Sequence, residues 1–128
     1  MKTFTQKITK EELLEEIKTH RKNDQLIKGV YGEGKNGDWR GCAVGCSIHS
    51  INHRLGKKYA TNNHVVYEIE LGIPVWLARL EDTIFEGLPD KDSQAWPEKF
   101  IKAIPVGIDE EKLEMVKWKF CSFIFSNW

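Results

Sequence analysis

The chain has 128 residues, 41% of them hydrophobic, which is enough for one domain whose core needs no disulfide or metal to hold it together. Its 19 Lys and Arg residues balance 19 Asp and Glu residues, so a general polyanion-binding role such as nucleic-acid binding is disfavoured. The chain has three cysteines, an odd number, and its first residues lack the apolar run of a secretory signal, so we predict a cytoplasmic protein with free thiols. No apolar stretch is long enough to span a bilayer, so we predict a soluble protein with no membrane partner.

The first predicted element is a helix from Thr9 to Asp24. Thr9 is followed three residues later by Glu12, and this spacing is typical of a capping box at a helix N-terminus. A glycine-rich stretch then runs from Gly29 to Arg40 and contains an Asn-Gly pair, so it predicts a loop or a short hairpin. The sequence does not indicate a role for this loop.

Helical segments, bounded by glycine, proline or N-cap residues, continue to the end of the chain: Cys42–His53, Thr61–Leu71, Pro74–Glu86, one within Asp90–Ile104, and one from Asp109 onwards that becomes very apolar by Cys121, Phe123 and Trp128. Gly72 suits the residue after a helix, and Pro74 suits the first position of the next one. The sequence therefore predicts a mainly α fold, a compact single-domain bundle of five to six helices.

One segment gathers much of the chain's titratable chemistry on a single helical stripe. Its four members stand at i, i+4, i+7 and i+11 and are Cys42, Cys46, His49 and His53. At about 100° per residue they fall within about 60° of one another. One ion cannot reach them all, because the outer two are about 16 Å apart at about 1.5 Å per residue. A site on this stripe would therefore use a subset, such as His49 with Cys46 or His53.

Helical phase turns further titratable groups toward the core. The apolar stripe of the first helix, when extended, carries His20 and Asp24 inward. In the segment Thr61–Leu71 we assign Glu70 to the solvent side, which leaves His64 and Glu68 one turn apart on the inner half.

The segment Pro74–Glu86 places one more carboxylate among apolar neighbours. Glu81 lies on its core side, whereas Asp82 and Glu86 lie opposite the core face. Since burying an unpaired charge is costly, Glu81 is expected to have a partner, and Arg40 or Arg79 is the simplest structural one.

The central part of the chain contains unusual strings, among them GCAVGC, the Tyr67-Glu68 pair and LGIPVWLARLED. They belong to GCAVGCSIHS and to HVVYEIELGIPVWLARLEDTIFEGLPDKDSQAWPEKFIKAIPVGID. From His20 to Asp109 the chain resembles a family of small uncharacterised bacterial and phage-associated proteins. That family has no assigned activity, so the resemblance implies a single bacterial domain and neither a catalytic residue nor a cofactor.

The first functional interpretation is a metal or proton-transfer pocket, because His and carboxylate groups from facing helices are how bundles hold transition metals. Its centre would be His49, His64 and Glu68. Around this centre we place the supporting residues Cys46, Glu81, His20, Asp24, Cys42 and His53. The chain has neither a C-x-x-C nor a Glu-x-x-His motif, so the cofactor is open, with a divalent transition metal as the candidate.

Two other interpretations stay open. A thiol-dependent enzyme would use Cys42, near a helix N-terminus whose dipole would lower its pKa, or Cys46 with His49 as its base. A non-catalytic binding or regulatory module would instead keep the buried polar network for structural reasons. The sequence leaves undecided whether the protein is an enzyme, whether its partner is a small molecule or a protein, and its oligomeric state.

Overall fold

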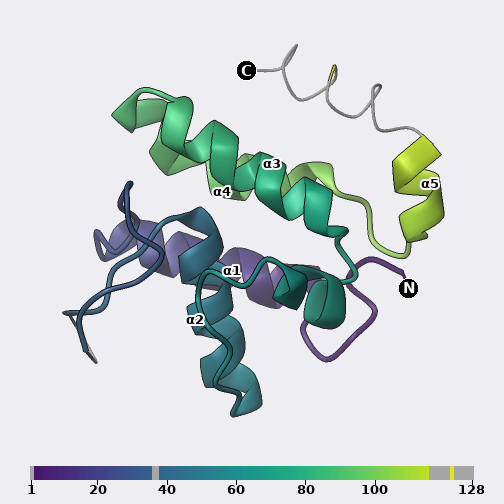
Figure 1. Cartoon of the computed structure of the whole chain (residues 1–128), viewed down its shortest axis with the longest axis horizontal. Helices are drawn as coiled ribbons and strands as arrows, with labels where there is room; N and C mark the ends of the chain where they lie inside the picture. The colour runs from purple at the N-terminus through teal and green to yellow at the C-terminus, as the bar shows by residue number, and fades with distance from the viewer. Residues whose placement is uncertain (1, 36–37, 116–121, 123–128) are drawn as a thin grey trace.

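Six helices surround a shared apolar core in the computed structural model, which describes residues 2–35, 38–115 and 122 (Figure 1). They are α1 (Lys10–Lys22), α2 (Ala43–Leu55), the π-helical turn η2 (Tyr67–Leu71), α3 (Val75–Gly87), α4 (Asp90–Ala103) and α5 (Glu110–Met115). Within those residues, β pairing is limited to isolated bridges. The predicted mainly α bundle is confirmed.

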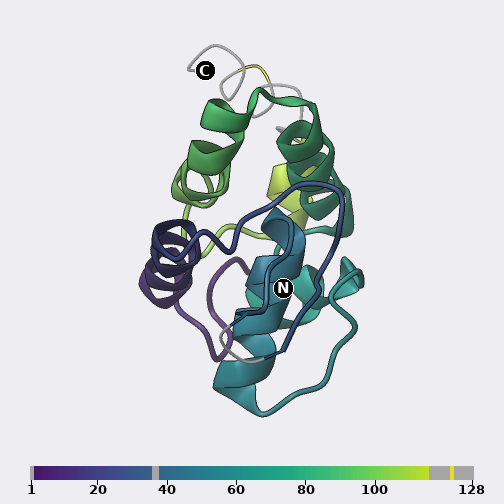
Figure 2. The ribbon, with the colours of Figure 1, turned by 90° about the vertical axis from the view of Figure 1, so that its left-hand side faces the viewer.

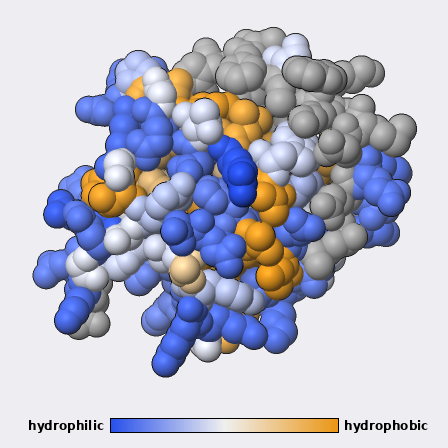
Figure 3. All heavy atoms as spheres, viewed as in Figure 1, coloured by the Kyte–Doolittle hydropathy of each residue, from blue (hydrophilic) through white to orange (hydrophobic). Residues whose placement is uncertain are grey.

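The four long helices form a closed ring of contacts. α1 packs against α2 and α4, and α3 also packs against α2 and α4, as the two perpendicular ribbon views show (Figures 1 and 2). The interior is filled by large, fully buried side chains, including Trp96, Phe85, Phe100 and Tyr67. Hydrophilic residues cover most of the face drawn in Figure 3, with smaller hydrophobic patches between them.

Side chains cap the N-termini of the first two helices. Thr9 Oγ1 accepts a hydrogen bond from the Glu12 N–H, and the Glu12 carboxylate accepts one from the Thr9 N–H, which is the predicted capping box. In α2 the cap is Cys42, whose Sγ accepts from the Gly45 N–H at 3.4 Å. Cys42, the first residue of the predicted stripe of cysteines and histidines, is therefore the N-cap of α2.

The first helix ends earlier than predicted. α1 stops at Lys22, and Asp24 lies beyond it with a positive φ of 54°. The extended helical phase no longer applies there, so the expected inward position of Asp24 is wrong, and its side chain is exposed.

The predicted helix over 61–71 is correct only in its last part. The chain makes turns through residue 64, becomes helical at Val65, and forms a π-helical turn at Tyr67–Leu71. A π-helix pairs i with i+5 and is wider than an α-helix, so the phase of 100° per residue does not hold. Glu70 is consequently buried, contrary to our assignment, and accepts a hydrogen bond from the Tyr59 hydroxyl at 2.8 Å.

The glycine-rich stretch is a loop closed by one small antiparallel bridge. Glu33 and Arg40 exchange both backbone hydrogen bonds, at 2.8 and 2.9 Å. The prediction of a loop or short hairpin over 29–40 is confirmed for its described residues.

This loop lies directly on the first turn of α2. The Cys42 N–H donates to the Val30 carbonyl at 2.8 Å. A Cβ added to Gly45 would stand 1.6 Å from the Tyr31 carbonyl oxygen, so only glycine allows the two backbones to approach this closely. The contact fixes Tyr31 beside the N-terminus of α2.

In the part of the chain that the structure describes, no helix is both long and apolar enough to cross a membrane.

The predicted last helix is present as α5, while its apolar continuation with Cys121, Phe123 and Trp128 lies outside the described residues.

Candidate functional site

Candidate site residues gather in two groups beside α2, and each group combines sequence-predicted residues with others. The first, which we call the thiol-carboxylate cluster, faces α3 and consists of Cys42, Asp82 and Glu86. The second, which we call the histidine cleft, faces α1 and is lined by Glu16, Thr19, His20, Gln25, His49, Ser50 and His53.

Three potential ligand atoms converge in the thiol-carboxylate cluster. The Cys42 Sγ and one carboxylate oxygen each of Asp82 and Glu86 lie within 4.8 Å of one another. The two acids stand one turn apart on α3 and so share a face, while Cys42 approaches from the start of α2. Among the described His, Cys, Asp and Glu residues, no other group of three is arranged in this way.

Two further polar groups contact Asp82. Its Oδ2 accepts a hydrogen bond from the Tyr31 hydroxyl at 2.7 Å and lies 3.2 Å from Nε2 of His64. The Tyr31 ring meets the His64 ring edge-on, with 5.7 Å between centroids. The hydrogen bond to Asp82 raises the pKa of Tyr31 to about 12, so the phenol remains a donor at neutral pH.

The thiols do not have the character that a nucleophile needs. Burial raises the pKa of Cys42 to about 12; the Gly45 N–H opposes this rise, and the nearby acidic residues add to it. The expected lowering of this pKa by the helix dipole is therefore wrong, because desolvation outweighs it. Burial likewise raises the pKa of Cys46, whose Sγ donates to the Gly41 carbonyl at 3.3 Å.

Glu81, next to Asp82 in α3, is fully buried and has an unexpected partner. The Tyr67 hydroxyl donates to its Oε1 at 2.6 Å, and its Oε2 has no hydrogen-bond partner among the described residues. The expected pairing with Arg40 or Arg79 is wrong, since Arg40 lies near Glu33 instead. Burial raises the pKa of Glu81 to about 8, so it is mostly a neutral acid at pH 7.

The histidine cleft has a volume of about 400 Å³ and contains a chain of hydrogen-bonding groups. His20 is buried, as predicted, with Nε2 2.6 Å from Ser50 Oγ and Nδ1 3.0 Å from Gln25 Oε1. Ser50 also lies 3.0 Å from a carboxylate oxygen of Glu16, which pairs with Arg54. Both ring nitrogens of His20 are thus occupied.

His49 is held in the same cleft by stacking. Its ring lies face to face with the Trp39 indole, with centroids 3.8 Å apart and planes inclined by 8°. The His20 ring is 6.4 Å away, measured between centroids. His53, one turn further along α2, is exposed at the cleft.

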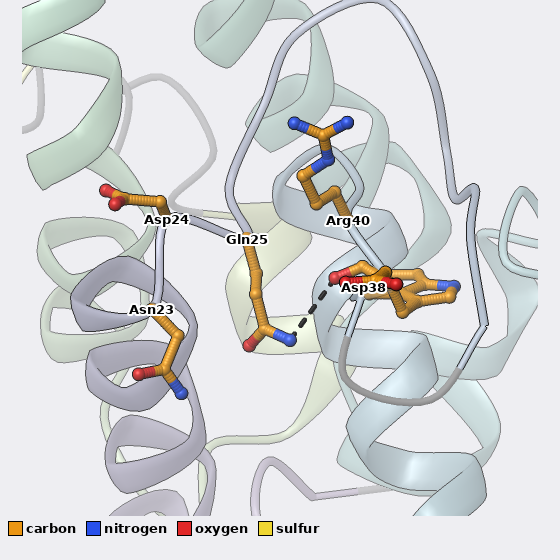
Figure 4. A pocket seen from close by; sticks show the side chains of 6 residues that line it. Asn23, Asp24, Gln25, Asp38 and Arg40 are labelled. Carbon is orange, nitrogen blue, oxygen red and sulfur yellow. Dashed lines mark hydrogen bonds between the residues drawn. The ribbon is translucent and has the colours of Figure 1, made fainter.

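Another pocket, of about 420 Å³, shares Gln25 with the histidine cleft and is lined by Asn23, Asp24, Gln25, Asp38, Trp39 and Arg40 (Figure 4). The Gln25 amide donates to the Trp39 carbonyl at 3.2 Å. In Figure 4 the Asp24 carboxylate and the Arg40 guanidinium point away from that amide. The pocket therefore lacks polar groups that converge on one point.

The expected centre of His49, His64 and Glu68 is not assembled as one ligand group. His49 lies in the histidine cleft, whereas His64 contacts the thiol-carboxylate cluster. Glu68 is half-buried, and its backbone carbonyl accepts from the Gly72 N–H at the end of η2. The turns before η2 explain this separation, because His64 and Glu68 do not share one regular helix.

Asp82 and Glu86 are the candidate site residues that the sequence prediction missed. We assigned both to the outer side of their helix, and Glu86 is exposed, yet the Asp82 side chain is only 15% exposed. A signal was present, since Asp82 follows the fully buried Ala78 by four residues and precedes the fully buried Phe85 by three.

Comparisons with models of known protein families, with curated proteins and with solved structures each find no match to this chain. The resemblance to a bacterial and phage-associated family stays a prediction.

Proposed function

We propose that the protein binds one divalent metal ion, Zn²⁺, at the thiol-carboxylate cluster. The observation that carries this proposal is the convergence of three ligand atoms from Cys42, Asp82 and Glu86 within 4.8 Å. A thiolate combined with carboxylates and an imidazole is a donor set that suits Zn²⁺.

His64 is the candidate for a fourth ligand; its ring lies outside the group of three atoms within 4.8 Å of one another and would turn toward the ion on binding. Its Nε2 lies 3.2 Å from the Asp82 Oδ2. Two ligand atoms that each stand about 2.0–2.1 Å from one tetrahedral ion are about 3.3 Å apart, so this spacing suits a shared ion. The four donors would come from the start of α2, the turn before η2, and α3.

The local charge favours a cation. Burial is the main cause of the raised pKa of Cys42, and the carboxylates of Asp82 and Glu86 raise it further, so negative charge lies near its sulfur. A divalent ion would displace the thiol proton and offset that charge. We infer a structural role, because four protein ligands would close the coordination sphere and tie three segments together.

The experiment is metal analysis and zinc titration of the full chain prepared without a His tag, in competition with a chelator. We expect one equivalent of zinc in the unmodified protein and its loss in Cys42→Ser, in which serine still caps α2. Cys46→Ser is the matched control, because it removes an equally buried thiol outside the cluster. Absence of stoichiometric zinc, or equal loss in both variants, would contradict the proposal.

A further inference from the structure

We propose a second metal site in the histidine cleft, where His49 and His53 together chelate one divalent transition metal ion of the kind that imidazole binds, such as Ni²⁺ or Cu²⁺. Both residues line the same cleft of about 400 Å³, and they stand at i and i+4 on α2. Two histidines at this spacing lie on one helix face, and their side chains can turn toward one ion, as in helical histidine pairs that hold metals.

These two imidazoles are available as ligands, whereas the third one in the cleft is not. His20 uses Nε2 toward Ser50 and Nδ1 toward Gln25. In the described part of the chain, by contrast, the nitrogens of His49 and His53 make no hydrogen bond. Stacking on Trp39 fixes the plane of the His49 ring and leaves its nitrogens, which lie in that plane, uncovered by the indole face.

A polar wall faces the two histidines across the cleft. Glu16, on α1, lines this wall, forms an ion pair with Arg54 at 2.9 Å and lies 3.0 Å from Ser50 Oγ.

This site differs from the thiol-carboxylate cluster in its coordination. Two protein ligands leave the remaining positions to water, and these positions face the open cleft beside Ser50 and His20. The two sites share no ligand, so the inference does not depend on the proposed function.

The test is a titration of the full chain with Ni²⁺, followed by calorimetry and by tryptophan fluorescence. We expect one equivalent bound in the cleft, with quenching of Trp39, whose ring stacks 3.8 Å from that of His49. His49→Ala and His53→Ala should each weaken the affinity at least about tenfold, which is the lower end of what loss of even an outer-shell partner costs a metal site. Trp39→Phe should keep the binding and lose the quenching.

His64→Ala is the matched control, because it removes a histidine of the other site and should leave the quenching unchanged. His53 is exposed, so its variant should fold even if the His49 variant does not, and circular dichroism will verify both. Equal Ni²⁺ affinity in His53→Ala and the unmodified protein would overturn the inference. Quenching that survives in His53→Ala at one equivalent would overturn it as well.

Discussion

His64 and Asp82 are 18 residues apart in the chain, yet His64 Nε2 and Asp82 Oδ2 lie only 3.2 Å apart. The contact joins the turn before η2 to the middle of α3. Both side chains are largely buried, with 13% and 15% of their surfaces exposed, so bulk water screens the pair only weakly. The same carboxylate oxygen also holds Tyr31, which brings the glycine-rich loop into the same arrangement.

The Tyr31 hydroxyl is expected to stabilise the loop through Asp82. Tyr31→Phe keeps the ring that meets His64 and removes only the donor to Asp82. We expect a loss of about 1–2 kcal/mol in the free energy of unfolding, since hydrogen bonds to charged groups contribute somewhat more than neutral ones. Urea denaturation with a chelator present measures it, and an unchanged midpoint would show that the bond contributes nothing.

Gly45 is expected to be irreplaceable at the contact between the loop and α2. In Gly45→Ala the new Cβ would stand 1.6 Å from the Tyr31 carbonyl oxygen, which is backbone and cannot turn aside. We expect destabilisation by about 3 kcal/mol or more, as for severe overpacking. Thermal unfolding measures this loss.

Gly87→Ala is the control for that experiment. Nothing lies within 4 Å of a Cβ at Gly87, at the end of α3, and its φ is not positive. This change should be neutral or stabilising by up to about 1 kcal/mol, because alanine favours helix and restricts the unfolded chain. Equal effects of the two substitutions would contradict the steric explanation.

The sequence predicted the helices where local chemistry decides them. Thr9 and Glu12 form a capping box that depends on three residues of spacing, and Gly72 takes the positive φ of 67° expected after a helix. The buried positions of His20 and Glu81 also followed from phase alone, since each continues a regular apolar stripe.

The arrangement of the site depends on features that the regular spacing of residues in an α-helix does not predict. The π-helical turn changed the phase at Glu70, and an early helix end released Asp24 to solvent. Asp82 is covered by Tyr31 and His64, which lie 51 and 18 residues away along the chain. Pairings at such distances are set by tertiary packing, so no local pattern indicates them.

The raised pKa of Glu81 predicts that the free energy of unfolding falls as the pH rises. Burial raises its pKa in the folded state from 4.5 to about 8, so between these values the folded protein holds a proton that the unfolded chain has lost. Stability from this group is present below pH 4.5 and is lost as the pH rises toward 8, at up to about 1.4 kcal/mol per pH unit.

Glu81→Gln tests this linkage, because the amide can still accept from the Tyr67 hydroxyl but does not titrate. Between pH 5 and pH 8 the unmodified protein should lose a few kcal/mol more than the variant, measured by urea denaturation in chelator. Parallel curves for the two proteins would show that the raised pKa of Glu81 is not linked to folding.

The lowered pKa of His20 predicts the opposite dependence at acidic pH, where the free energy of unfolding should rise with pH. Burial lowers its pKa below 6.5, although Gln25 and Glu16 partly oppose this. As the pH falls through 6.5 the unfolded chain takes up a proton that the folded protein resists, so stability should decrease. His20→Gln, which can still hydrogen-bond in this position, should flatten that decrease, while His53→Gln at an exposed position serves as the control. Denaturation midpoints from pH 7 to pH 5 measure both, and the expectation fails if His20→Gln follows the same curve as the unmodified protein.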